Sequence, residues 1–147
     1  MAVTTMSLLT IIDALKVMLF NGTHDLDTHT FKKALFTSAW VTTTQLYSST
    51  NELATANGYT QGGATLANSA LSVVASNVRF DADDTVFTAS GGDIGPARYE
   101  VIYNDTDASK TILGYRELDN TPADVTATDG NTLTTQENAL GIFEVTF

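Results

Sequence analysis

RYEVIYND, Arg98–Asp105, is the segment that decides the fold class. Tyr99, Val101 and Tyr103 recur at every second position, so in an extended chain these three side chains would share one face. Alternation with this period is typical of a β-strand and does not fit the 3.6-residue period of a helix. The segment ends in Asn104-Asp105, two residue types that favour turns.

The same alternation recurs along most of the chain, between short segments of turn-forming residues. It predicts strands over Thr30–Ser38, at Leu71 and Val73, at Val78 and Phe80, at Leu113 and Tyr115, and in the final GIFEVTF, where Phe143, Val145 and Phe147 share a face. The turn signals are Ser76-Asn77, Ser90-Gly91-Gly92, Asn104-Asp105 and Asp129-Gly130. Short strands separated by such turns are typical of sandwiches and barrels. We therefore expect one mainly β domain, an antiparallel β-sandwich, jelly-roll-like or barrel fold over residues 23–147, preceded by an N-terminal helix or arm over residues 1–22.

Composition and charge exclude several classes of function. The 147 residues contain no cysteine, which excludes disulfide bonds, thiol catalysis and cysteine–zinc sites. The chain has 17 acidic and 7 basic residues, for a net charge of −10, and Lys32-Lys33 is its longest basic run. Nucleic acids and anionic membranes are bound through clusters of basic side chains. We therefore expect no direct contact with nucleic acid or with a membrane, and we expect no cofactor.

The N-terminal segment TTMSLLTIIDALKVMLFNG, Thr4–Gly22, has a helical pattern instead. Its apolar residues at helical spacing are Leu8, Ile12, Leu15 and Leu19. Thr5 or Ser7 could cap this helix and Gly22 could end it. The apolar run is shorter than the ~20 residues of a membrane span, and it lacks the basic flank of a signal peptide. We favour a helix packed on the sheet over an arm that reaches a neighbouring subunit.

A long polar segment, Val41–Gly58, follows the first predicted strand, and we expect it to be a surface loop. Loops of this length are uncommon unless they contact something. Trp40, Tyr47 and Tyr59 lie in or beside the loop, where aromatic side chains could anchor a partner. We favour the alternative that these side chains cover the end of the β core.

GYTQGGATLANSAL, Gly58–Leu71, brings glycines together as phosphate-binding loops do. A P-loop requires GxxxxGK[ST] followed by a helix, and a dinucleotide-binding loop requires GxGxxG at the start of a helix. This stretch has neither spacing, and a β-like run follows it. We therefore expect a tight reversal in which Gly62 and Gly63 adopt positive φ angles.

THDLDTH, Thr23–His29, contains residue types that bind metal ions. Asp25, Asp27 and His29 would point the same way on an extended chain. No other segment supplies an obvious second half of a metal site. We therefore favour a solvated polar loop and assign no metal-binding residues.

Two acidic segments, FDADDT at Phe80–Thr85 and NDTDASK at Asn104–Lys110, resemble calcium loops in composition. Both lack the glycine and glutamate that an EF-hand requires at its sixth and twelfth positions. A calcium site of another kind, between loops of the β domain, stays open.

The sequence offers little that points to catalysis. Nucleophilic catalysis requires a base beside the nucleophile, and the histidines are limited to His24 and His29. Glu100 and Glu144 lie in alternating strands, where we expect them on outward faces. We therefore do not expect an enzyme.

Several phrases occur in an order that resembles a family of small virion proteins of tailed bacteriophages. They are FKKALFTSAW, NGYTQGGATLANSAL, VRFDADDTVFT, ARYEVIYNDT, LGYRELD and GIFEVTF. Members of that family typically carry a strand ending in ALxTS, a GYTxGG turn, an FDADD segment, an ARYxVIY strand and a later GY strand. The resemblance extends from about Thr28 to Phe147, so the N-terminal segment is less closely tied to it.

The resemblance implies a structural protein of the virion, and proteins similar to this one are often considered head decoration or cement proteins. Such a protein is made in the host cytoplasm, binds the outer face of the capsid and bridges subunits of the major capsid protein. We would expect a homo-oligomer, a dimer or trimer, with cyclic symmetry. Its apolar anchors would be Leu8, Ile12, Leu15, Leu19, Trp40, Tyr47 and Tyr59.

Two alternative functions stay open. A tail, fibre or adaptor component of the virion could use the same β fold. A carbohydrate-binding β module would also be compatible with the aromatic residues and the acidic loops.

Overall fold

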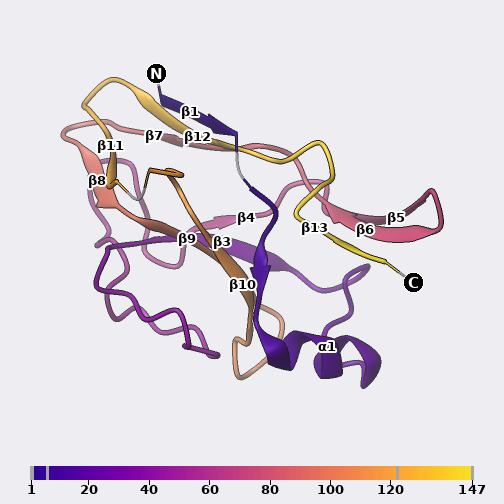
Figure 1. Ribbon diagram of the computed structural model, residues 1–147. Helices are drawn as coiled ribbons and strands as arrows, with labels where there is room; N and C mark the ends of the chain where they lie inside the picture. The colour runs from indigo at the N-terminus through magenta and orange to yellow at the C-terminus, as the bar shows by residue number, and fades with distance from the viewer. Residues whose placement is uncertain (1, 6, 122, 147) are drawn as a thin grey trace.

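The computed structural model describes residues 2–5, 7–121 and 123–146, and it is mainly β, as the sequence predicts (Figure 1). Its described helix is α1, Asp13–Phe20. The strands are β1 (Ala2–Thr5), β2 (Thr10–Ile11), β3 (Phe31–Phe36), β4 (Ala64–Thr65), β5 (Ala70–Val74), β6 (Asn77–Asp81), β7 (Thr85–Thr88), β8 (Ile94–Ala97), β9 (Tyr99–Asn104), β10 (Ile112–Glu117), β11 (Val125–Ala127), β12 (Thr132–Gln136) and β13 (Phe143–Val145). The predicted strands around Leu71, Phe80, Val101 and Tyr115 therefore all form, whereas Phe147 lies outside the described residues.

A five-stranded antiparallel sheet in the order β2-β10-β9-β3-β4 forms the centre of the molecule. A second sheet, β1-β12-β7, lies beside it, so the two make a sandwich-like arrangement (Figure 1). The sheet β13-β6-β5 extends from one end of this sandwich, and the pair β11-β8 lies at the other end (Figure 1). None of the sheets formed by the described residues closes on itself, so the fold is open and the barrel alternative is wrong. The pair β1–β12 is parallel, which departs from the purely antiparallel expectation.

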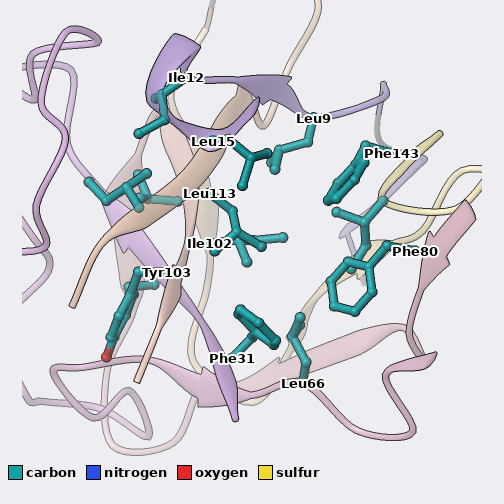
Figure 2. Packing of buried hydrophobic residues seen from close by; sticks show 14 of the residues in the cluster. Leu9, Ile12, Leu15, Phe31, Leu66, Phe80, Ile102, Tyr103, Leu113 and Phe143 are labelled. Atoms are coloured by element: carbon teal, nitrogen blue, oxygen red, sulfur yellow. The ribbon is translucent and has the colours of Figure 1, made fainter. Parts of the chain in front are cut away.

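Two clusters of buried apolar side chains hold these sheets together. In the larger cluster, Phe80 packs between Phe31 and Phe143, with ring centroids 5.5 and 5.6 Å away. Figure 2 shows these rings facing Leu15 and Ile102, which come from α1 and β9. The smaller cluster lies between the central sheet and β12, and includes Leu35, Phe87 and Leu133.

The N-terminal segment is helical only in its second half, which corrects the predicted helix. α1 begins after Ile12 and has no side-chain cap there, so neither Thr5 nor Ser7 caps it. At the other end, Asn21 is the C-cap residue and Gly22 follows with a φ of +79°. The prediction that Gly22 ends the helix is therefore confirmed.

The residues before α1 are extended because their backbone groups bond to other strands. The N–H of Leu9 donates to the carbonyl of Ile142, and the N–H of Ile12 donates to the carbonyl of Leu113. Thr10–Ile11 pairs with β10. An amide that bonds to a neighbouring strand is no longer available to the ladder of a helix, so sheet pairing overrides the local helical pattern.

The predicted strand Thr30–Ser38 and the loop that follows it are both confirmed. β3 occupies the centre of the predicted range, and residues 37–63 contain no strand. They form only isolated bridges, two of which join Glu52 to Phe36 and Leu46 to Thr111. Both faces of β3 are covered, because five of its six residues are buried. The loop is therefore part of the covering of the central sheet.

Candidate functional site

Most of the N-terminal residues proposed as interface anchors lie in the core. Leu15 and Ile12 are buried, and Leu19 packs against the same cluster. Leu8 is exposed. This face of the segment therefore binds the chain's own sheet, which is the packed arrangement that we favoured over an arm.

The other side of α1 exposes two large apolar side chains that the sequence analysis missed. Val17 is 65% exposed and Phe20 is 83% exposed. Together with Lys16 and Asn21 they line a shallow depression, and we call these four residues the outer face of α1. α1 lies at the margin of the molecule (Figure 1). A contiguous patch of exposed apolar side chains is a candidate binding surface. The three-residue spacing places Val17 and Phe20 on one side of the helix, but only the structure shows that this side faces outward.

The three aromatic residues beside the long loop pack onto the central sheet instead of pointing to solvent. Trp40 and Tyr59 are buried and Tyr47 is half-buried. The ring of Trp40 lies 5.3 Å from that of Tyr115, and Tyr47 stacks on Tyr103 with 4.1 Å between centroids. These side chains therefore cover the β core, which is the arrangement that we favoured.

Glu52, which the sequence analysis did not single out, organises this region. Its Oε1 accepts hydrogen bonds from the Tyr59 hydroxyl at 2.7 Å and from the Gly62 N–H at 2.6 Å, and its Oε2 accepts from the Tyr47 hydroxyl at 2.6 Å. The hydroxyl of Tyr103 donates to the Gly62 carbonyl at 2.7 Å. The carboxylate thus ties the loop, the glycine-rich reversal and the sheet together.

The glycine-rich stretch makes a tight reversal, as predicted. Gly62 and Gly63 have φ angles of +99° and +73°, and the chain then enters β4. A Cβ on Gly63 would collide with the backbone carbonyl of Lys33 in β3. The glycines therefore permit a close approach of two backbone segments, and the anion that the loop binds is the carboxylate of Glu52.

Four charged side chains form a buried cluster between the two main sheets. Arg116 donates from Nε to Glu100 at 2.7 Å and from Nη2 to Glu137 at 2.7 Å. Lys33 pairs with Glu137, lies 3.5 Å from Glu100 and donates to the Thr135 hydroxyl at 3.1 Å. Two cations and two anions therefore balance, which is the condition under which buried charges are tolerated.

The prediction that Glu100 faces outward is wrong, because its side chain is fully buried in this cluster. Burial by itself would raise the pKa of its carboxyl, but the charges of Lys33 and Arg116 outweigh burial and leave the pKa below its ordinary value. Glu144 is only partly buried and pairs with Arg79 at 3.0 Å. The signal for the cluster was Lys33, because the residues two positions before and after it in FKKALF, Phe31 and Leu35, are apolar.

The two histidines meet at the side chain of Asn104. The Nδ1 atoms of His24 and His29 lie 3.0 and 2.9 Å from the side-chain nitrogen of Asn104. Asp25 instead accepts hydrogen bonds from Thr28. Burial lowers the pKa of His24, although Asp107 opposes this shift. The prediction of a solvated loop is therefore wrong for His24, which is buried.

The carboxylates of the acidic turns bond within their own loops or to neighbouring segments of the fold. Asp107 accepts from the Thr111 hydroxyl at 2.5 Å, and Asp84 accepts from the Glu137 N–H at 2.8 Å. Asp105 pairs with Lys110 and Lys32. Within residues 2–5, 7–121 and 123–146, no three acidic or histidine side chains gather in a way that would hold a metal ion.

The hairpin β5–β6 is the second exposed apolar feature that the sequence analysis did not single out as a binding surface. Every residue of β5 is exposed, and Val73 is 76% exposed. β5 is the edge strand of its sheet, and the hairpin extends away from the body of the molecule (Figure 1).

Comparison of the chain with protein-family models, with curated proteins and with solved structures found no match. The described helix α1, with eight residues, falls well short of the length needed to cross a bilayer. The resemblance to virion proteins therefore stays a prediction.

Proposed function

We propose that this protein is a structural protein of a bacteriophage virion, a decoration protein that binds the outer face of the capsid and stabilises the shell. The ordered phrases that resemble small virion proteins motivate the proposal. The observation that carries it is the outer face of α1, where Phe20 and Val17 stand exposed on an element whose other side is anchored in the core.

The outer face of α1 has the chemistry of a docking surface. An aromatic side chain that loses most of its exposed area on binding contributes strongly to an interface. α1 is held by Leu15 in the core and by the pairing of β2 with β10, so Phe20 would be presented from a fixed position. A fixed anchor loses little conformational entropy when it binds.

The internal contacts of the polar residues also support a binding role over a catalytic one. Glu52 is engaged by two tyrosines and a backbone amide, and Glu100 and Glu137 are engaged by Lys33 and Arg116. These contacts hold segments of the fold together.

On a capsid, a modest interface of this kind is sufficient. The shell presents many identical sites, and an oligomer that engages several of them gains avidity without new contacts. Ligands that bind one state of the shell stabilise that state by mass action. We infer that expansion of the shell creates the site by bringing capsid subunits into register.

Binding of the purified protein to separated heads and tails of the parent phage tests the proposal. Copy number per particle is measured by quantitative mass spectrometry. We expect saturable, high-copy binding to expanded heads, and reduced occupancy for the double variant V17S/F20S. The matched control V41S/V86S removes two other exposed apolar side chains and should bind as the wild type does.

Other outcomes would redirect or overturn the proposal. Binding to tails alone, or in a few copies, would favour the tail, fibre or adaptor alternative. Binding to neither particle would overturn a virion role. The carbohydrate alternative is disfavoured because Trp40 and Tyr59 are buried, so a sugar cannot stack on their rings.

A further inference from the structure

We propose that β5 is a self-association edge, through which two copies of this chain pair antiparallel and join their β13-β6-β5 sheets into one. The inference rests on the edge strand itself and does not depend on the proposed function. The partner of the exposed hairpin would be the same hairpin of a second copy of the chain.

The backbone of β5 leaves hydrogen-bonding groups free along its outer edge. Ala75 and Ser76 form a two-residue connection with φ angles of +50° and +71°, and Val74 pairs with Asn77 beside it. In such a hairpin the residues that flank the turn form a hydrogen-bonded pair, and bonded and non-bonded pairs then alternate. The N–H and C=O groups of Leu71 and Val73 therefore point away from β6.

β5 has none of the features by which edge strands are protected from pairing. Charged side chains, proline and bulges are the usual protection. The register of β5 with β6 is unbroken from Ala70 to Val74, and the chain has no charged residue between Glu52 and Arg79. In a protein with a net charge of −10, two copies repel each other over most of their surface. The uncharged edge is where they can approach.

The side chains of β5 give the paired edge an apolar face that continues from the core. Leu71 lies opposite Phe80 and Val73 lies opposite Val78, while Phe80 is in turn paired with Phe143. Leu71 and Val73 thus extend the face that carries the buried Phe80 and Phe143. A second copy of β5 would cover them with the same two residues.

Symmetry then sets the register. When the outward groups of Leu71 and Val73 bond to a second β5 about a two-fold axis, Leu71 pairs with Val73 of the other copy and Ser72 faces Ser72 on the axis. The Ser72 pair is a non-hydrogen-bonded pair, in which the two Cα atoms approach most closely. The arrangement is isologous and closes at two copies.

The oligomeric state in solution, measured by sedimentation velocity over a range of concentrations, tests the proposal. We expect the wild-type protein to reach twice the 15.7 kDa chain mass and to dissociate on dilution. V73P removes an outward N–H, and V73K places a charge on the edge, so both variants should be monomeric. V41K adds the same charge in the loop and should dimerise as the wild type does.

Isotope-filtered NMR on a mixture of labelled and unlabelled chains gives a second measurement. A contact between the Hα atoms of Ser72 in different copies is expected, together with amide protection of Leu71 and Val73 that is lost on dilution. Circular dichroism establishes that V73P and V73K are folded. A wild type that stays monomeric at all concentrations, or a V73P variant that dimerises normally, would overturn the proposal. A monomer whose binding to heads is abolished by V73P would also overturn it, in favour of pairing with a capsid strand.

Discussion

The backbone N–H of Gly62 donates a hydrogen bond to the carboxylate of Glu52, with 2.6 Å between the nitrogen and Oε1. A glycine-rich loop that presents a backbone amide is a common way to bind an external anion. Here the anion belongs to the chain itself, ten residues earlier, and the amide binds it inside the fold. The glycine-rich stretch therefore has a structural role, because its amide binds a carboxylate of the same chain.

Replacing Glu52 by glutamine should destabilise the protein. One acceptor oxygen becomes an NH₂ group that faces a donor, so the Tyr59, Tyr47 and Gly62 groups can no longer all be satisfied. A buried group left without its partner costs about 1–3 kcal/mol. Urea unfolding followed by the fluorescence of Trp40 measures the change, and Y47F, which removes one half-buried partner, should cost less. An unchanged midpoint for E52Q would show that the network does not stabilise the fold.

Tyr47, Tyr59 and Tyr103 should resist ionisation while the protein is folded. Burial is the main cause that raises the pKa of each hydroxyl above its ordinary value of 10.0, and the charge of Glu52 adds to it. Because the pKa of each hydroxyl is higher in the folded than in the unfolded protein, the protonated tyrosines stabilise the folded state. This contribution is complete below about pH 10 and is lost as the pH rises further. In an alkaline titration, the tyrosinate absorbance of these three residues should therefore appear only as the protein unfolds.

The same titration of E52Q tests the cause of the shift. Since burial is the largest contribution, the tyrosines of a folded E52Q protein should still ionise late. Complete ionisation near pH 10 with a native near-ultraviolet circular dichroism spectrum, in either protein, would contradict this account.

Replacing Arg116 by methionine should be severely destabilising. The change leaves the buried Glu100 and Glu137 with Lys33 as their one cation, and breaking a buried ion cluster in this way costs about 3–5 kcal/mol. R98M is the matched control, because Arg98 pairs with Asp124 near the surface and such pairs contribute about 0–1 kcal/mol. Equal losses for the two variants, measured by urea unfolding, would contradict the importance of the cluster.

The cluster also predicts an acid transition. The folded-state pKa of Glu100 lies below its ordinary value of 4.5, so the stability that it contributes is present above that pH and is lost as the pH falls below it. The variant R116M, if it folds, should unfold at higher pH than the wild type does on acid titration. An acid midpoint that does not move would exclude Arg116 as a cause of the shift.

Replacing Gly63 by alanine should cost far more than replacing Gly91. Both glycines have positive φ angles, +73° and +82°, so both substitutions carry a backbone cost of about 1 kcal/mol. The Cβ at position 91 meets nothing within 4 Å, whereas at position 63 it meets the Lys33 carbonyl and lies 2.7 Å from the Cα of Ala34. Overpacking adds about 1–3 kcal/mol. Similar melting temperatures for G63A and G91A would contradict the close approach.

Local pattern was sufficient to predict the strands but not the N-terminal segment. In RYEVIYND, the two-residue alternation and the tertiary structure agree, because β9 is paired on both sides. Around Leu9 and Ile12, a helical pattern is overridden by backbone bonds to Ile142 and Leu113, which lie more than a hundred residues away in the chain. No local pattern could reveal those partners.

The candidate surfaces were harder to predict from the sequence than the fold. From the sequence, Trp40 and Tyr59 could either contact a partner or pack in the core. The structure shows that they pack in the core, Trp40 against Tyr115 and Tyr59 against Phe87. Conversely, Val17 and Phe20 belong to an apolar run that gives no indication of which side faces outward. Exposure is a property of the whole fold, since it depends on what the other segments cover.

The sequence by itself determined the mainly β class, the turn at Gly62-Gly63 and the absence of cysteine chemistry, because each follows from residue type and local spacing. Only the tertiary structure decided that Glu100 lies inside the protein. A carboxylate in an alternating strand is expected to face water, since an isolated buried charge is too costly. It can be buried here because Lys33, Arg116 and Glu137, brought from three other strands or their ends, meet it in one place.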